Sequence, residues 1–301
     1  MESFIQQKTL FHYMEERIAQ LKEHGQYRTA ETYQTTLNSF RRFRKNKDLP
    51  FEELNPKLLS DYEHYLKKRK LARNTISFYL KRLRAIHHKA VEEEGIEDRH
   101  PFRLTHTTSE KTVKRAVPLT IIRKLKAMYL PDRSQRFARD MFLFSFYTRG
   151  MSFIDIAYLK KTNLKNGTLS YRRKKTGQAL SMHWENCMRE IAGHYAAKAS
   201  SPYLLSIINP KEKDDRRQYY NASTLINRKL KKLGRRLGLP SPLTMYVARH
   251  SWASIAREEG IPMSVISEGM GHESEKTTRI YLAALETQVI DRANQKILKK
   301  L

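Results

Sequence analysis

Residues 74–86 read Asn-Thr-Ile-Ser-Phe-Tyr-Leu-Lys-Arg-Leu-Arg-Ala-Ile, and this stretch indicates the architecture of the first third of the chain. Its apolar side chains recur every three or four positions, which places them on one face of an α-helix. Asn74 is expected to begin the helix and Gly95 to end it. The predicted inward residues are Ile76, Tyr79, Leu80, Leu83 and Ile86, and the predicted outward cations are Arg73, Lys81, Arg82 and Arg84.

Three shorter amphipathic segments precede this helix. The first stops at Gly25, and Thr29 is a candidate N-cap for the second. Asn55 followed by Pro56 is a strong start signal for the third, because Pro is favoured at the first helical position. Together the four segments predict a compact helical bundle with one basic flank.

The charge of the whole chain points to a polyanionic partner. The chain has 301 residues, a length typical of two domains. Lys and Arg number 58 against 31 Asp and Glu, which gives a formal net charge of +27. Such an excess usually serves to meet a polyanion. Nucleic acid is the leading partner, and an anionic membrane surface is the second.

Several protein classes are excluded by composition. The single Cys187 allows no disulfide within the chain and no cysteine-based metal cluster, which fits a reducing cytosol. Residues 1–20 are polar and mixed in charge, unlike a secretory signal. The longest apolar stretch, around 141–147, is far shorter than the roughly 18 residues of a membrane span. We therefore expect a cytoplasmic protein with no membrane segment.

The periodicity lapses between the bundle and the rest of the chain. We expect a helical DNA-binding domain over 1–106, a linker over 107–116 and a second domain over 117–301. Residues 168–173 and 179–182 are the only convincing strand pair. The fold class is therefore mainly α with a small β-hairpin. Helices are predicted at 120–129, 134–148, 185–198, 222–237, 244–259, 262–269 and 274–285, followed by a basic tail at 287–301.

Five residues of the second domain carry reactive or cationic side chains within short, distinctive stretches. Arg149 stands in Thr-Arg-Gly-Met-Ser, and Lys175 in Lys-Lys-Thr-Gly. Arg249 stands in Tyr-Val-Ala-Arg-His-Ser-Trp, and His272 in Gly-Met-Gly-His-Glu-Ser. Tyr281 follows in Thr-Thr-Arg-Ile-Tyr-Leu, nine positions after His272.

This series resembles the tyrosine recombinases, the family of phage integrases, Xer recombinases and Cre. Their pattern is an Arg that ends a helix, a hairpin Lys, a His-x-x-Arg box, a Gly-His and a Tyr nine residues later. The resemblance covers about 118–285, and the basic bundle is similar to the family's core-binding domain. It implies a compact bacterial site-specific recombinase or DNA invertase that acts on double-stranded DNA as a dimer or tetramer.

The chemistry of these residue types suits phosphodiester cleavage. Arg149 and Arg249 offer planar, permanently charged forks for phosphate oxygens. The resemblance implies that Tyr281 attacks the phosphorus to form a 3′-phosphotyrosine, that Lys175 protonates the leaving 5′ oxygen, and that His272 contacts the phosphate or positions the nucleophile. No metal or other cofactor is expected, because the arginines supply the positive charge.

One position departs from the family pattern. The His of the His-x-x-Arg box falls at Tyr246. A phenol hydrogen-bonds well, but its pKa of about 10 makes it a poor proton acceptor at neutral pH. His250 is adjacent to Arg249 and does not replace that imidazole, because consecutive helical residues point about 100° apart. We expect Tyr246 to line the site in an altered role and His250 to be structural.

Other assignments remain open at this stage. Lys174 competes with Lys175 as the general acid, because alternation along a strand decides which side chain points inward. Ser152 and Asp155 have the form of a capping box, so Asp155 is expected to be a cap. The candidate DNA-binding residues are Arg73, Asn74, Lys81, Arg82, Arg84, Arg172, Arg173 and Lys174.

The resemblance also implies partners and rival functions. In relatives a C-terminal helix like the tail at 287–301 docks on a neighbouring protomer, and accessory DNA-bending proteins are possible partners. A bacterial protein of this kind is expected with the nucleoid. Two other functions stay open, a type IB topoisomerase and a non-catalytic DNA-binding regulator.

Overall fold

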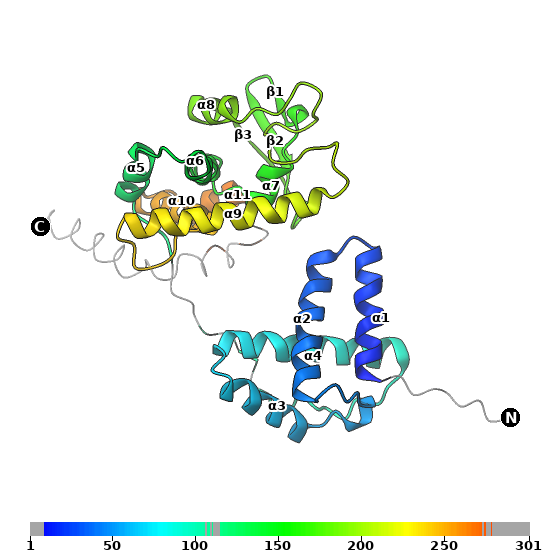
Figure 1. Cartoon of the computed structure of the whole chain (residues 1–301). Helices are drawn as coiled ribbons and strands as arrows, with labels where there is room; N and C mark the ends of the chain where they lie inside the picture. The colour runs from blue at the N-terminus through cyan, green and yellow to red at the C-terminus, as the bar shows by residue number, and fades with distance from the viewer. Residues whose placement is uncertain are drawn as a thin grey trace, which may run out of the picture. The chain divides into compact units, whose positions relative to one another are not determined.

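The chain folds into two compact units, Met1–Thr112 and Val113–Leu301, in a computed structural model (Figure 1). The structure describes residues 9–105, 107–108, 110, 115–272, 274 and 278. The domain limits predicted at 106, 107–116 and 117 stay a prediction. No helix among the described residues is long and apolar enough to cross a membrane.

The first unit is helical, as the sequence predicts. Its core is formed by apolar side chains from every helix, and the Phe40 and Tyr62 rings meet edge-on with centroids 4.8 Å apart. The mainly α fold class is confirmed for this part of the chain. Its elements are α1 (Leu10–Glu23), α2 (Tyr27–Phe43), a 3-10 turn (Phe51–Glu53), α3 (Pro56–Lys68) and α4 (Arg73–Glu94).

Local signals placed most of these helix ends correctly. The Asn55 side chain caps α3 by accepting a bond from the Leu58 N–H at 2.9 Å, and Gly95 ends α4 with φ +66°. The prediction for Thr29 is wrong, because α2 begins earlier and Thr29 lies inside it. The Gln26 N–H closes α1 by bonding Leu21 O, so the next helix starts immediately after it.

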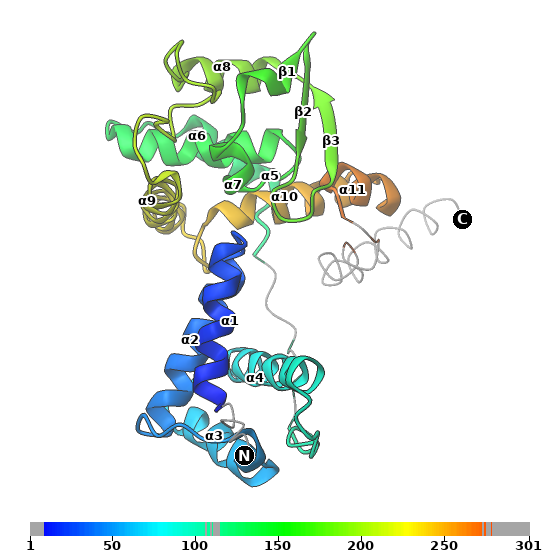
Figure 2. The ribbon, with the colours of Figure 1, turned by 90° about the vertical axis from the view of Figure 1, so that its right-hand side faces the viewer.

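The second unit is built around α6, which packs against α5, α8, α9 and α10 (Figures 1 and 2). Met141, Phe142 and Phe144 on α6 are completely buried, so this helix forms the centre of the core. The elements are α5 (Leu119–Ala127), α6 (Arg133–Tyr147), α7 (Phe153–Ala157), a 3-10 turn (Lys161–Asn163), β1 (Leu164–Lys165), β2 (Thr168–Arg172), β3 (Ala179–His183), α8 (Asn186–His194), α9 (Asp215–Arg236), α10 (Met245–Glu258) and α11 (Met263–Met270).

The sheet confirms the predicted hairpin and adds a third strand. The antiparallel order is β1-β2-β3, and Leu169 pairs with Met182 on the buried face. The two residues of β1 are too few to show alternation, which is why the sequence does not reveal them. The turn between β2 and β3 reaches toward α10 and α11 (Figure 2).

Two other predictions about this unit need correction. Helix α9 begins at Asp215, seven residues before the predicted start, because Asp214 caps it by accepting from the Arg217 N–H. Ser152 is the N-cap of α7 but makes no capping box, since its hydroxyl donates to Asp155 Oδ2 at 2.6 Å. The predicted helix at 274–285 and the tail at 287–301 lie outside the described residues, apart from Ser274 and Thr278.

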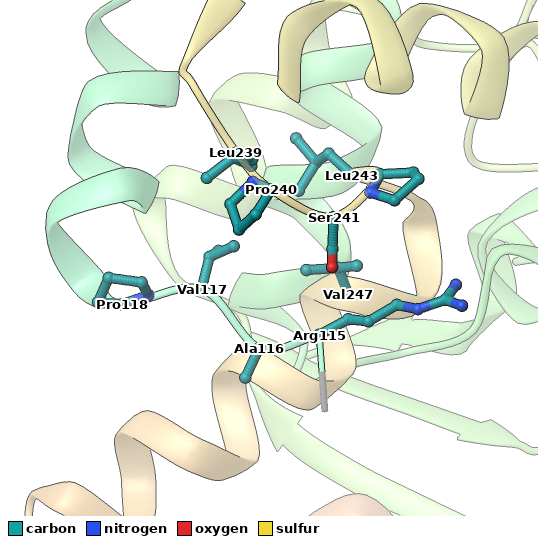
Figure 3. A pocket seen from close by; sticks show the side chains of 10 residues that line it. Arg115, Ala116, Val117, Pro118, Leu239, Pro240, Ser241, Leu243 and Val247 are labelled. Atoms are coloured by element: carbon teal, nitrogen blue, oxygen red, sulfur yellow. The ribbon is translucent and has the colours of Figure 1, made fainter. Parts of the chain in front are cut away.

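The segment that leads into α5 is tied to α10. The Val117 N–H donates to Ser251 Oγ at 2.9 Å, and both residues are buried. Residues 115–118 also line a pocket of about 240 Å³ together with residues 239–243 and Val247 (Figure 3). Its walls are mostly proline, leucine and valine, so this pocket lacks the charged groups that the sequence singled out.

Candidate active site around two arginines

Arg149 is placed by a tight turn at the end of α6. Its backbone is left-handed with φ +57°, and the following Gly150 has φ +78°. The turn is closed by the Gly150 N–H, which bonds Ser145 O at 2.7 Å. The Arg149 guanidinium thereby reaches Ser181 O on β3, with an Nη1–O distance of 3.4 Å.

Arg249 is the buried member of the pair. Its side chain is 6% exposed, and it donates from Nη1 to Gly150 O at 3.0 Å and from Nη2 to Met270 O at 2.7 Å. A Cβ added at Gly150 would lie 2.6 Å from Arg249 Cγ. Only glycine allows this approach, so the turn that carries Arg149 rests directly on the helix that carries Arg249.

His272 lies against the Arg249 guanidinium. Its Nε2 is 2.9 Å from Arg249 Nη2, and its Nδ1 is 2.7 Å from the hydroxyl oxygen of Thr278. Burial, together with the positive charges of Arg249, Arg173 and Lys175, lowers the pKa of His272 to about 4. The imidazole is therefore neutral at physiological pH.

This shifted pKa gives a pH dependence of stability. The unfolded His272 binds a proton near pH 6.5, whereas the folded one binds it only near pH 4, so protons favour the unfolded chain in between. We expect the melting temperature of the second unit to fall as pH drops from about 6.5 toward about 4. His272→Gln should reduce that fall, measured by calorimetry at pH 7 and pH 5.

The comparison between the two proteins isolates His272. Burial also lowers the pKa of His87, but that residue is present in both proteins and its contribution cancels. An equal loss of melting temperature on acidification in the wild type and in His272→Gln would contradict the assignment.

The hairpin closes over the same cluster from another side. The Arg173 guanidinium donates to Gly271 O. Gly271 has φ +64°, and a Cβ there would lie 3.0 Å from Leu180 Cδ1 and 3.1 Å from Arg173 Cδ. The end of α11 therefore carries glycine where the hairpin crosses it, and His272 follows directly.

Lys174 and Lys175 lie in the turn between β2 and β3, so alternation along a strand does not distinguish them. The Lys174 N–H donates to Asp155 Oδ1 at 2.8 Å, and its ammonium lies 3.7 Å from the centre of the Tyr158 ring. Lys175 is one of the cations that lower the pKa of His272. Lys174 thus fastens the turn, and Lys175 is the lysine whose charge acts on the cluster.

Asp155 has a different role from the one expected. It is buried, and its two oxygens accept bonds from the Lys174 N–H and the Ser152 hydroxyl. This carboxylate therefore joins α7 to the hairpin turn instead of capping its own helix. The sequence spacing suggested a cap because it cannot show which distant backbone group will reach the carboxylate.

Tyr246 occupies the first turn of α10, three residues before Arg249. Its side chain is 55% exposed and packs edge-on against the His250 ring, with centroids 4.5 Å apart. The sequence predicts only a structural role for His250, and this contact places its ring beside position 246. The role of Tyr246 in the site stays a prediction, and Tyr281 lies outside the described residues.

Arg84 does not face outward as predicted. It is half-buried, and Nη2 donates to Phe102 O at 3.3 Å and Thr105 O at 3.2 Å. Nη1 donates to the Thr107 hydroxyl at 3.2 Å. The Arg84 guanidinium therefore holds the segment after α4 in place. The backbone carbonyls of that segment accept its hydrogen bonds because they lie outside any helix or sheet.

Other candidate DNA contacts also take part in contacts within the chain. Asn74 accepts from the Glu110 N–H at 2.8 Å, and Arg73 pairs with the Glu110 carboxylate at 2.9 Å. Arg82 lies over the Phe78 ring, and Lys81 is exposed on α4. Arg172 is exposed on β2 and donates to Gly177 O at 3.1 Å. Their contacts with DNA stay predictions.

The chemistry available at the cluster is that of anion binding and proton transfer. The Arg249 guanidinium from α10, the Arg149 side chain that follows α6 and a neutral imidazole lie at the end of α11, and the Lys175 charge acts on that imidazole. Within the part of the chain that the structure describes, no group of three or more His, Cys, Asp or Glu residues could hold a metal ion.

The comparisons with known proteins cover both units. Residues 135–288 match the sequence profile described as phage integrase family, and residues 9–111 match the phage integrase SAM-like domain. The tyrosine recombinase XerA of Pyrococcus furiosus is 26% identical over 200 residues, 64% of this chain and 66% of the relative. The tyrosine recombinase XerC of Rickettsia canadensis (strain McKiel) is 47% identical over 58 residues, 19% of each chain.

Solved structures share the fold of this chain. A lambda integrase(75-356) dimer bound to a COC′ core site has a TM-score of 0.66 at 15% identity, over 91% of this chain and 95% of that one. The XerH site-specific recombinase, in a post-cleavage complex with palindromic difH substrate, has a TM-score of 0.65 at 15% identity, over 88% and 78%. Among the curated relatives above, this chain spans between about a fifth and two thirds of their length.

Proposed function

This chain belongs to the phage integrase family of tyrosine recombinases, and from that premise we propose that it carries out site-specific recombination of double-stranded DNA. The observation that carries the proposal is the contact between Arg249, Gly150 and His272, which holds a buried guanidinium and an imidazole beside Arg149. A preorganised set of donors suits a phosphate that gains charge during substitution.

The proposed reaction cleaves one strand by transesterification. The Tyr281 oxygen attacks the phosphorus, the new bond is a 3′-phosphotyrosine, and the bond from phosphorus to the 5′ oxygen breaks. Lys175 gives a proton to the departing 5′ oxygen. Rejoining reverses these steps with a 5′ hydroxyl from a second strand, so the phosphodiester energy is kept and no cofactor is consumed.

The partners follow from the same proposal. We propose that the first unit binds the core site and that two or four copies assemble on DNA, as the dimer of lambda integrase does on its core site. The basic residues of the first unit would supply affinity and register, because phosphate contacts carry no base information directly. The cytoplasm, with the nucleoid, is the proposed location, and accessory DNA-bending proteins are proposed partners.

The test is a nicked suicide substrate built from DNA that flanks the gene. Cleavage near the nick releases a short oligonucleotide, so the covalent adduct accumulates and is seen on a denaturing gel. We expect an adduct whose DNA-linked peptide, identified by mass spectrometry, contains Tyr281. Tight binding without an adduct would favour a DNA-binding regulator. Relaxation of any supercoiled plasmid without exchange of partners would favour a type IB topoisomerase.

Lys175→Ala should lower the cleavage rate about a hundredfold, the lower end of the contribution of general acids. A substrate whose bridging 5′ oxygen is replaced by sulfur should restore the rate, since a thiolate leaves without needing a proton. Rates are measured by single-turnover adduct formation. Lys174→Ala is the matched control, and its smaller defect should show no rescue by sulfur. If sulfur restored the rate of Lys174→Ala and not that of Lys175→Ala, Lys174 would be the general acid.

A further inference from the structure

Thr278 is a residue that the sequence did not single out. Its side chain is completely buried, and its hydroxyl oxygen lies 2.7 Å from His272 Nδ1. No sequence signal marks it, because a threonine in an amphipathic stretch is usually a packing residue. The structure instead places it on the imidazole that contacts Arg249.

The two contacts of the ring define its tautomer. A guanidinium has only donors, so Arg249 Nη2 must donate to His272 Nε2. A neutral imidazole carries one proton, which therefore sits on Nδ1 and is donated to the Thr278 hydroxyl oxygen. The opposite tautomer would place an N–H against the guanidinium.

We propose that Thr278 is a positioning residue that holds His272 as the Nδ1–H tautomer and so makes Nε2 the proton acceptor of the site. The catalytic part of this inference rests on the proposed recombination, while the tautomer itself does not. In other functional histidines, a hydrogen bond at one ring nitrogen fixes whether the other nitrogen carries a proton. Thr278 provides that hydrogen bond for His272.

This acceptor matters because position 246 carries a phenol. A phosphate oxygen is a stronger acceptor for Arg249 than a neutral imidazole, so bound phosphate draws the guanidinium N–H away and uncovers the Nε2 lone pair. Its negative charge also raises the proton affinity of His272. As the Tyr281 oxygen bonds to phosphorus, the phenolic proton passes to His272 Nε2. The resulting imidazolium keeps the hydrogen bond from Nδ1–H to Thr278.

The test reads the tautomer by nitrogen NMR of the full-length protein labelled with 15N-histidine, with His272 assigned by comparison with His272→Gln. Wild type and Thr278→Ser should show a protonated Nδ1 and a bare Nε2. Thr278→Val should show averaging or a protonated Nε2. Its single-turnover cleavage should fall about tenfold, the effect of losing one hydrogen bond of about 1.4 kcal/mol, and Thr278→Ser should recover most of it.

Thr36→Val is the matched control. Thr36 is also completely buried but lies in the first unit, where its hydroxyl donates to Thr32 O. It should leave the tautomer and the cleavage rate unchanged. A single Nδ1–H signal and full cleavage in folded Thr278→Val would overturn the inference. Absence of an adduct in the wild type would instead overturn the proposed function, with the tautomer still measurable.

Discussion

Tyr281→Phe is expected to abolish the covalent adduct completely while DNA affinity stays within about threefold of the wild type. The substitution removes only the phenolic oxygen, which is the atom proposed to bond to phosphorus. Phenylalanine carries no nucleophilic oxygen, so the loss should have no residual rate. Affinity should remain, since we propose that it comes from many phosphate contacts. Adduct formation on the suicide substrate and a gel-shift titration measure the two effects.

The control for this experiment is Tyr129→Phe. Tyr129 is 84% exposed between α5 and α6, and no role is assigned to it. Its substitution should leave both the adduct and the affinity unchanged. An adduct that persists in Tyr281→Phe would move the nucleophile elsewhere, and Tyr246 would be the first residue to test.

Arg249→Ala should lower the cleavage rate about a thousandfold, the upper end of the effect of removing one preorganised donor group. Arg249→Lys should recover little, because an ammonium keeps the charge but lacks the planar fork that bonds two partners at once. The same truncation leaves Gly150 O and Met270 O without their donor, at a cost of about 1–3 kcal/mol each. Melting temperatures must therefore be measured beside single-turnover rates.

Arg257→Ala provides the matched control, because it removes the same charge from the same helix two turns later. It should change cleavage only in proportion to its effect on DNA binding. If the loss of cleavage rate in both variants only matched their loss of DNA affinity, Arg249 would be one phosphate contact among many. A large loss confined to Arg249, in folded protein, supports its place at the reacting phosphate.

The sequence predicted the features that depend on neighbours in the chain. The Asn55–Pro56 start and the Gly95 stop are local signals, and both are confirmed. The hairpin was visible because alternation needs only five residues per strand. Thr29 shows the limit of this approach, because the position of the preceding turn decided where α2 begins.

The features that depend on tertiary contacts could not be predicted. The sequence places Arg84 on the outward face of its helix, as it does the exposed cations. In the structure, three acceptors from the segment after α4 accept hydrogen bonds from its guanidinium. Thr278 bonds His272 and Asp155 bonds the Lys174 amide, and residue spacing alone reveals neither bond. Spacing predicted which residues form the site, while the contacts that distinguish Lys174 from Lys175 are visible only in the geometry of the turn.

The bond between Val117 and Ser251 has a practical consequence for dissecting the chain. Ser251 lies two residues after Arg249 on α10, so the start of the second unit is fastened beside a site residue. A fragment cut at residue 117 would turn the donating amide into a charged terminal amine and would strip Arg115 and Ala116 from the pocket wall. An expression fragment of the second unit should therefore begin upstream of Arg115.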